Sequence, residues 1–179
     1  KVYDGDTIIL EDGKHIRLLG VNTPEIESRQ RAEEPGGVAA KKWLQAQLQD
    51  KKVYLEYDEV KLDKYKRQLA HVFLSNGKHL NLALLENGLG TVSIIPPNVR
   101  YSDKLTQAQQ HAEKMQLGIW AMPEYQLKPI AQIANHAKGW QRFSATFHTI
   151  KKNRKYTRLL INDKIDIRIS NQNLKAFPP

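Results

Sequence analysis

Cysteine is absent from this sequence of 179 residues. Its absence excludes disulfide bridges, thiolate nucleophiles and metal or iron–sulfur sites with cysteine ligands. Long apolar runs are missing too: no stretch approaches the roughly 20 residues that span a bilayer, so we expect no transmembrane segment. The six histidines form no i, i+4 pair. Neither a phosphate loop ending in Gly-Lys-Ser/Thr nor a Gly-x-Ser-x-Gly motif occurs.

Acidic side chains are scarce in the last third of the chain. The whole sequence holds 28 basic and 19 acidic side chains, a net charge of +9. Residues 1–122 hold 17 basic and 16 acidic side chains, whereas residues 123–179 hold 11 and three. A basic excess in one short segment indicates a surface for nucleic acid or another polyanion, and a solvated basic face is an equally good interpretation.

Neither end of the chain has the features of a natural terminus. The sequence opens at Lys1 inside a predicted strand, without an initiating methionine or a signal-peptide pattern, and it closes on two prolines. We therefore expect the natural polypeptide to be longer, which leaves a targeting segment open.

Residues 1–122 are predicted to be a domain of mixed strands and helices without a regular βαβ alternation. The predicted strands are residues 7–10 and 16–21, which an Asp12-Gly13 turn joins in a hairpin, and residues 53–57 and 69–74. The predicted helices are residues 38–49, 80–86 and 103–116. Ser102 is the expected N-cap of the last helix, Leu105, Ala108 and Ala112 its buried stripe, and Gly118 its end. The pattern indicates an α+β fold with a compact β-barrel flanked by helices.

The remaining residues are predicted to be a linker, 123–137, and a basic three-stranded β segment, 138–179. Its expected strands are marked by alternating Phe143, Ala145 and Phe147, by residues 156–161, and by Ile165, Ile167 and Ile169 after an Asn162-Asp163 turn. Three strands in about 40 residues are marginal as an independent fold. We expect this segment to pack on the first domain, to dimerise, or to lack further strands.

The candidate chemical groups of the first domain begin with Asp4 and Asp6, which flank a glycine at the start of a strand. Such carboxylates suit a hard cation, although Asp-Gly-Asp more often forms only a turn. Arg17 lies in an otherwise apolar strand, so it needs an anionic partner if it points inward and is ordinary if it points outward. Glu25 follows the next strand and could position or deprotonate a water molecule, or be a surface glutamate.

A basic run at residues 64–67 contains an aromatic residue, Tyr65. It is either a phosphate clamp that includes Arg67 or the charged tip of a hairpin. Together with the preceding groups, this half of the chain offers guanidiniums, carboxyl groups and a carboxamide. Metal-assisted phosphodiester hydrolysis needs this set: cation ligands, a base that activates water, and positive charge for the transition state.

Motifs occur in a preserved order and spacing over about residues 1–120. They are Asp4-Gly5-Asp6-Thr7, Arg17-Leu18-Leu19-Gly20-Val21-Asn22-Thr23-Pro24-Glu25, Asp63-Lys64-Tyr65-x-Arg67-x-Leu69-Ala70, Asn81-x-Ala83-Leu84-Leu85-x-x-Gly88-Leu89 and Leu117-Gly118-Ile119-Trp120. This pattern resembles the staphylococcal (micrococcal) nuclease, or thermonuclease, family. The resemblance implies a five-stranded OB-type β-barrel with three flanking helices, which agrees with the strands and helices predicted above.

The resemblance also implies a metal site and a nuclease reaction. Asp6 would ligate Ca²⁺ together with the side chain of Asn22 and the backbone carbonyl of Thr23, with Asp4 close by; other divalent cations are alternatives. The implied reaction is endonucleolytic hydrolysis of DNA and RNA at the P–O5′ bond, which leaves 3′-phosphates.

The implied catalytic residues are Arg17, Glu25 and Arg67. The two arginines would bind the scissile phosphate and stabilise the transition state, and Glu25 would be the general base or would order the attacking water. Lys64 and Tyr65 would contact a terminal phosphate of the bound nucleotide.

Two departures from the family pattern affect the metal and base sites. Asn22 stands where the family archetype has an aspartate, so one ligand charge is lost and we expect weaker Ca²⁺ binding or another ion preference. Ile94 and Pro96 stand where the archetype has base-stacking tyrosines, and Tyr101 is the nearest aromatic residue. The alternative function is therefore a catalytically weak or inactive nucleic-acid-binding module of the nuclease-like type.

The resemblance does not reach residues 123–179. There Lys151, Lys152, Arg154 and Lys155 are candidates to follow a phosphate backbone or to dock the protein on an anionic envelope or partner. An unspecific nuclease is hazardous beside its own genome, so we expect an extracytoplasmic location, periplasmic or secreted.

Overall fold

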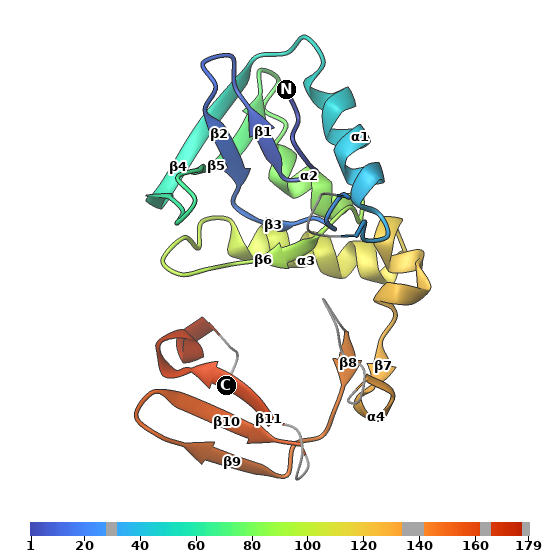
Figure 1. Ribbon diagram of the computed structural model, residues 1–179, viewed down its shortest axis with the longest axis vertical. Coiled ribbons are helices and arrows are strands. Elements are labelled where there is room, and N and C mark those ends of the chain that lie inside the picture. Colours follow the sequence, from blue (N-terminus) through green and yellow to red (C-terminus); the bar gives the residue numbers. More distant parts are fainter. Residues whose placement is uncertain (28–31, 134–141, 162–165, 177–179) are drawn as a thin grey trace. The chain divides into compact units, whose positions relative to one another are not determined.

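The computed structural model describes residues 1–27, 32–133, 142–161 and 166–176 (Figure 1). The chain divides into two compact units, Lys1–Pro123 and Glu124–Pro179, called unit 1 and unit 2 below. Across the described ranges, no helix combines the length and the apolar character needed to cross a membrane.

Unit 1 is built on a four-stranded sheet with the order β1-β2-β5-β4. Its strands are β1 (Thr7–Ile9), β2 (His15–Leu18), β4 (Val53–Leu62) and β5 (Gln68–Leu74). β1 and β2 form the predicted antiparallel hairpin, β2 runs parallel to β5, and β4 runs antiparallel to β5. A separate antiparallel pair joins β3 (Gly20–Asn22) to β6 (Thr91–Ser93).

Three helices complete unit 1: α1 (Gly37–Leu48), α2 (Leu80–Glu86) and α3 (Ser102–Lys114). A 3₁₀ helix, η1 (Gly118–Ala121), follows them. α2 packs against β5 and α3, and α3 also contacts β3 and β6. The predicted stripe of α3 is confirmed, because Leu105, Ala108 and Ala112 are all buried.

The predicted ends of α3 are wrong. Ser102 is the first helical residue, and the N-cap is Tyr101, which has a left-handed backbone (φ 63°) and makes no side-chain capping bond. Tyr101 is held instead from β4, because its hydroxyl donates to Glu56. At the other end the helix stops at Lys114, since Gln116 adopts the left-handed conformation (φ 52°) and the Leu117 N–H donates to the Ala112 carbonyl.

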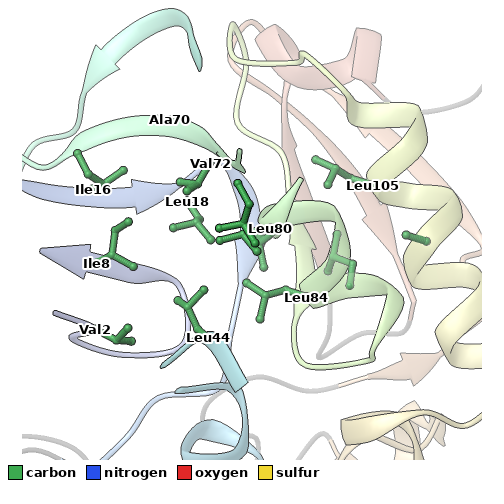
Figure 2. Packing of buried hydrophobic residues seen from close by; sticks show 14 residues of the cluster. Val2, Ile8, Ile16, Leu18, Leu44, Ala70, Val72, Leu80, Leu84 and Leu105 are labelled. Carbon is green, nitrogen blue, oxygen red and sulfur yellow. The ribbon is translucent and has the colours of Figure 1, made fainter. Parts of the chain in front are cut away.

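The core of unit 1 lies between the sheet and the helices. Figure 2 shows Ile8, Ile16 and Leu18 from the sheet facing Leu44 and Leu80 from α1 and α2, and all five are buried. Each such side chain contributes roughly 1.5–3 kcal/mol relative to an exposed one. This packing fixes the positions of the loops that carry the polar groups described below.

A buried asparagine ties α2 to the sheet. The Asn81 amide oxygen accepts a hydrogen bond from the Val72 N–H at 2.9 Å, and its amide nitrogen donates to the carbonyls of Leu19 at 2.8 Å and Ala70 at 3.2 Å. Leu19 lies between β2 and β3, so the same side chain also holds the bend at which the chain leaves the four-stranded sheet.

Unit 2 contains an antiparallel three-stranded sheet with the order β11-β10-β9. Its strands are β9 (Thr149–Lys152), β10 (Tyr156–Leu160) and β11 (Asp166–Ser170), and the 3₁₀ helix η3 (Asn171–Ala176) follows. A short parallel pair joins β7 (Lys128–Pro129) to β8 (Phe143–Ser144), with α4 (Ile130–Ile133) between them in the sequence. η2 (Pro123–Tyr125) spans the boundary with unit 1.

The predicted strand over residues 143–147 is wrong as a member of this sheet. Only Phe143 and Ser144 are extended as a strand, and they pair with β7, while β9 is the third strand. The cause is the turn after β9, where the Asn153 side-chain oxygen accepts the N–H groups of Lys155 and Tyr156, both at 2.8 Å. This tight turn brings β10 back against β9, the strand just before it in the sequence, so β9 takes the place of the predicted strand. The predicted Asn162-Asp163 turn and Ile165 lie outside the described residues.

Candidate active site

The candidate metal ligands and catalytic residues of unit 1 lie around one polar cavity of about 230 Å³. Its lining is Tyr3, Asp4, Asp6, Arg17, Asn22, Thr23, Pro24, Glu25 and Arg67. These residues come from the start of β1, from β2 and β3, and from the turn before β5. The structure thus brings together all seven residues that the sequence predicted as metal ligands or catalytic residues, although they are spread between Asp4 and Arg67 in the sequence.

Asp6 lies where the start of β1 closely approaches the end of β3, and Thr23 binds its carboxylate there. One of its carboxylate oxygens, Oδ2, accepts the Thr23 N–H at 2.9 Å and the Thr23 hydroxyl at 3.2 Å, and Oδ1 accepts the Thr7 hydroxyl at 3.1 Å. Gly5 allows this approach, because a Cβ there would lie 2.6 Å from the Thr23 hydroxyl oxygen and 2.7 Å from the Ala40 Cβ. The glycine of the Asp-Gly-Asp motif is therefore a packing requirement.

Arg17 points inward, and its guanidinium is surrounded by oxygen atoms. Nη1 donates to the carbonyls of Leu18 and Val21, both at 2.7 Å. Nη2 lies 3.1 Å from the Asp6 carboxylate and 3.1 Å from the Asn22 side-chain oxygen. Only 14% of the Arg17 side chain is exposed. Asp6 is thus the anionic partner that an inward arginine requires, and the oxygens of Asp6 and Asn22 converge on one positive charge.

The two carboxyl groups at the start of β1 lie close together. Asp4 accepts the N–H of Asp6 at 3.0 Å. Burial, followed by the nearby charge of Asp6, raises the pKa of Asp4 to about 6. This part of the cavity therefore concentrates negative charge that a bound cation would stabilise.

The donors around Asp6 suit a hard divalent cation. The available groups are the Asp4 and Asp6 carboxylates, the Asn22 amide oxygen and the Thr23 carbonyl, all of them oxygens, as Ca²⁺ prefers. Within the described ranges, no cluster of three or more His, Cys, Asp or Glu side chains could hold a metal ion. A cation here would therefore depend on the neutral oxygens of Asn22 and Thr23 as well as on the carboxylates.

Glu25 is positioned by the loop that leads into α1. Its N–H donates to the Glu34 carboxylate at 3.0 Å, and its carbonyl accepts the Glu34 N–H at 2.9 Å. The start of α1 presses against the same backbone, because a Cβ on Gly37 would lie 2.6 Å from the Glu25 carbonyl oxygen. The sequence motifs missed Glu34 and Gly37, although the Gly36-Gly37 pair before a helix signals a close approach.

Arg67 reaches the cavity from the turn between β4 and β5. Its Nε donates to the Asp63 carboxylate at 2.7 Å, and the N–H groups of Tyr65 and Arg67 donate to the other Asp63 oxygen, both at 2.9 Å. Burial acts to raise the pKa of Asp63, but the bonds from Arg67 outweigh it and the pKa lies below its ordinary value. Lys64 and Tyr65 lie at this turn with exposed side chains and do not line the cavity.

A second, mainly apolar cavity of about 390 Å³ adjoins the first. It shares Arg17, Asn22 and Arg67 with the polar cavity. Its apolar lining includes Val60, Leu62, Leu69, Ile95, Pro96 and Pro97. Asn98 ties this wall to β4, because its amide exchanges two hydrogen bonds of 2.8 Å with the backbone of Val60.

Sequence motifs identified only part of this second cavity. Pro96 lines it, whereas Ile94 and Tyr101 do not. The Tyr101 ring instead packs edge-on against His71, with 4.9 Å between the ring centroids. The side chains of Val60 and Leu62 are exposed on β4, which continues past the predicted strand 53–57 to Leu62, so the sequence prediction missed this apolar wall.

The four basic residues proposed from the C-terminal sequence all lie in unit 2. Lys151 and Lys152 are on β9, and Arg154 and Lys155 are in the turn to β10. All four are exposed.

Comparisons with known proteins agree with the motifs of unit 1. The profile of one family, described as Staphylococcal nuclease homologue, matches residues 15–122. The chain is similar to the protein named Thermonuclease of Staphylococcus intermedius, with 42% identity over 123 residues that cover 67% of this chain and 73% of the relative. It is also similar to the Thermonuclease of Staphylococcus hyicus, with 39% identity over 125 residues that cover 68% of this chain and 73% of the relative. Endonuclease YncB of Bacillus subtilis is 35% identical over 130 residues, which cover 70% of this chain and 61% of that protein.

Proposed function

The chain belongs to the staphylococcal nuclease family, and from this premise we propose that it is an endonuclease. The proposed reaction is hydrolysis of phosphodiester bonds in DNA and RNA, with Ca²⁺ or another divalent cation, to products that carry 3′-phosphates. Membership also means an OB-type fold of mixed helix and strand content, and we extend this to a closed five-stranded barrel. The observation that carries the function is the meeting of Arg17, Glu25 and Arg67 with the oxygen donors around Asp6 in one cavity.

In this proposal the two arginines bind the scissile phosphate. Carbonyl groups hold the Nη1 atom of Arg17, and Asp63 holds the Nε atom of Arg67, so both guanidiniums are fixed before substrate arrives. Such fixed donors stabilise the charge that develops on the phosphate oxygens and need no rearrangement during the reaction. Lys64 and Tyr65, on the turn beside Arg67, would contact a terminal phosphate of the bound strand.

Glu25 is the proposed base. Its carboxylate would take a proton from the attacking water as the new O–P bond forms, the P–O5′ bond would break, and O5′ would take a proton from solvent. The hydrogen bonds between Glu25 and Glu34 hold the backbone of this residue at the mouth of the cavity.

Asp4, Asp6, Asn22 and the Thr23 carbonyl would hold the cation. When bound, a divalent cation neutralises charge on the phosphate oxygens. Asn22 supplies an oxygen without a charge, so we propose that this chain binds Ca²⁺ more weakly than a family member with aspartate at this place.

Digestion of plasmid DNA and single-stranded RNA tests the proposal. Both substrates are expected to be cut in Ca²⁺, and a chelator or the Glu25→Ser variant is expected to abolish cutting. Cutting that persists at full rate in chelator, or in Glu25→Ser, would contradict the proposed chemistry.

A second candidate function, nucleic-acid binding without turnover, is favoured by Asn22 and by the second cavity, where none of the described lining residues is aromatic. It predicts salt-sensitive binding of DNA and no product in Ca²⁺, Mg²⁺ or Mn²⁺. Any cation-dependent product fragments would exclude it.

We also propose an extracytoplasmic location, periplasmic or secreted, because unspecific cleavage would threaten the genome of the producing cell. Fractionation of the producing cells, with nuclease activity assayed in each fraction, tests this. Activity confined to the cytoplasmic fraction would contradict it.

A further inference from the structure

The two units differ sharply in charge. Residues 1–123 carry 17 basic and 16 acidic side chains, whereas residues 124–179 carry 11 basic and three acidic ones. Long-range attraction to a polyanion depends on net charge and its distribution. Unit 1 is nearly neutral, so nearly all of the net positive charge of the chain lies in unit 2.

The strand register places a row of cations across the sheet of unit 2. Lys151 on β9 is directly opposite Arg158 on β10, and Arg158 is directly opposite Arg168 on β11. Opposite residues share a face and lie on strands about 4.8 Å apart. Tyr156 lies on the same face, two residues from Arg158. We call Lys151, Tyr156, Arg158 and Arg168 the basic face.

Only part of this charge is compensated within the sheet. Asp166 makes ion pairs with both Arg158 and Arg168 through their Nε atoms. For Lys151, and for Arg154 and Lys155 in the adjoining turn, no ion pair is formed with any residue that the structure describes. Like charges on directly opposite residues destabilise a sheet, so an anion bound beside Lys151 would stabilise the end of the row that Asp166 does not reach.

The opposite face of the sheet is mainly apolar, and at the edge strand β9 it carries the exposed side chains of Ile150 and Lys152. It carries Leu159, Ile167 and Ile169, which are half-buried, and the buried Thr157. The Thr157 hydroxyl donates to the side chain of Asn171 at 2.9 Å, at the start of η3. Among the residues of β9, β10 and β11, the basic face therefore carries three cations, whereas the opposite face carries one, Lys152.

The turn that carries Arg154 and Lys155 is held in place. Besides the two bonds to the Asn153 side chain, the Asn153 carbonyl accepts the Asn171 amide at 2.8 Å, and the Asn171 N–H donates to the Lys155 carbonyl at 2.9 Å. Fixed cations lose less conformational entropy on binding than mobile ones.

We propose that the basic face and its adjoining turn bind a single strand of nucleic acid and tether the substrate. Phosphates would contact Lys151, Arg154 and Lys155, and an unpaired base would stack on Tyr156, which is 44% exposed. The choice of this polyanion rests on the proposed nuclease function. A lipid surface fits less well, because the exposed aliphatic side chain of this sheet, Ile150, is on the opposite face. None of these residues lines the catalytic cavity.

The test measures binding of a fluorescent oligothymidylate to the full chain in chelator, where no cutting occurs. The variant Lys151→Gln/Arg154→Gln/Lys155→Gln removes three charges from the proposed surface. Its matched control, Lys42→Gln/Lys51→Gln/Lys52→Gln, removes three charges from exposed lysines of unit 1. Thermal unfolding of both variants is compared with the unsubstituted chain to confirm that they are folded.

The basic-face variant is expected to bind roughly 10- to 100-fold more weakly at about 0.1 M salt, with a slope of log K against log salt that falls by about 2. The control is expected to change affinity by about twofold at most. Equal losses in the two variants would overturn the proposal. So would tighter binding to vesicles of phosphatidylcholine and phosphatidylserine than to the oligonucleotide.

Cleavage in Ca²⁺ is measured in parallel, so failure of the proposed nuclease function is seen separately. Binding measured in chelator tests the proposed tether whether or not the chain cleaves nucleic acid.

Discussion

The cavity of unit 1 and the basic face of unit 2 both gather charged side chains, but they hold them in opposite ways. In the cavity, Arg17 is largely buried and contacts two carbonyls, a carboxylate and an amide oxygen. On the basic face, Lys151 and the cations of the adjoining turn are exposed. Buried, fixed charges act on a transition state at short range, whereas exposed cations attract a polyanion from a distance. The difference teaches that net charge alone does not locate the proposed active site, because unit 1, which holds it, is nearly neutral.

The largest expected effect comes from changing the shape of a buried charge without removing it. Arg17→Lys keeps one positive charge but loses the planar fork that binds two carbonyls and faces Asp6 and Asn22 together. We expect kcat/KM for an oligonucleotide to fall roughly 10³- to 10⁵-fold, as for other arginines that stabilise phosphoryl transition states.

Arg100→Lys is the matched control for Arg17→Lys, because Arg100 is also ion-paired in unit 1 but lies outside the cavity. Its activity is expected to stay close to that of the unsubstituted chain. Similar losses in the two variants would mean that the fold, rather than the cavity, responds to the change.

The next largest effect is expected from Glu25→Gln, which keeps the size of the side chain and removes the carboxylate of the proposed base. We expect a fall in kcat of roughly 10²- to 10⁴-fold with little change in KM, measured by initial rates over a range of substrate concentrations. Glu86→Gln removes an exposed carboxylate at the end of α2 and serves as the control. A variant at Glu25 that raises KM and leaves kcat unchanged would assign this residue to binding.

Sequence patterns predicted the structure most accurately where an element's own residues determine its conformation. Periodicity and turn residues predicted the β1–β2 hairpin, α2 and the buried stripe of α3. They failed where contacts from elsewhere decide, as at Tyr101 and Gln116, whose left-handed backbones set the ends of α3 in place of Ser102 and Gly118.

In the candidate site, too, local features could be predicted and contacts between distant segments could not. Motif spacing identified the residues that line the polar cavity, apart from Tyr3. It could not show that Gly5 and Gly37 permit close backbone approaches, nor that Glu34 fixes the backbone of Glu25. These contacts join segments that are separate in the sequence, and their distances are set by packing of the core.

A smaller effect is expected from acid on the packing of His71 and His79 in unit 1. His71 is 1% exposed on β5, and its Nδ1 lies 3.2 Å from Nε2 of His79. Burial lowers the pKa of each histidine to about 4. The unfolded chain takes up protons near pH 6.5, so the stabilisation is complete above that pH and is lost as the pH falls from 6.5 towards 4.

For His71 alone this loss amounts to roughly 2 kcal/mol between pH 7 and pH 5. Urea unfolding at both pH values measures it. His71→Gln is expected to shrink the difference in unfolding free energy between the two pH values, whereas His111→Gln, at an exposed position on α3, should leave it unchanged. If His71→Gln leaves the difference in unfolding free energy between the two pH values unchanged, His71 is not the source of the acid sensitivity.

The smallest expected effect is a change in Ca²⁺ affinity at the proposed metal site. Asn22→Asp keeps the oxygen that accepts from Arg17 and adds a ligand charge, so Ca²⁺ affinity is expected to rise about tenfold, measured by calorimetry. Asn76→Asp adds the same charge in an exposed turn, where the side chain accepts only a backbone N–H, and is expected to have no effect. A Ca²⁺ affinity that does not respond to Asn22→Asp would remove this residue from the ligand set.

The measurement that tests the account most directly is cleavage of an end-labelled oligonucleotide in Ca²⁺, with the new ends identified chemically. The account predicts fragments that end in 3′-phosphate, lost in Arg17→Lys and retained in Arg100→Lys. Binding of the oligonucleotide with no fragments in Ca²⁺, Mg²⁺ or Mn²⁺ would contradict it, because the cavity would then hold a strand without cutting it.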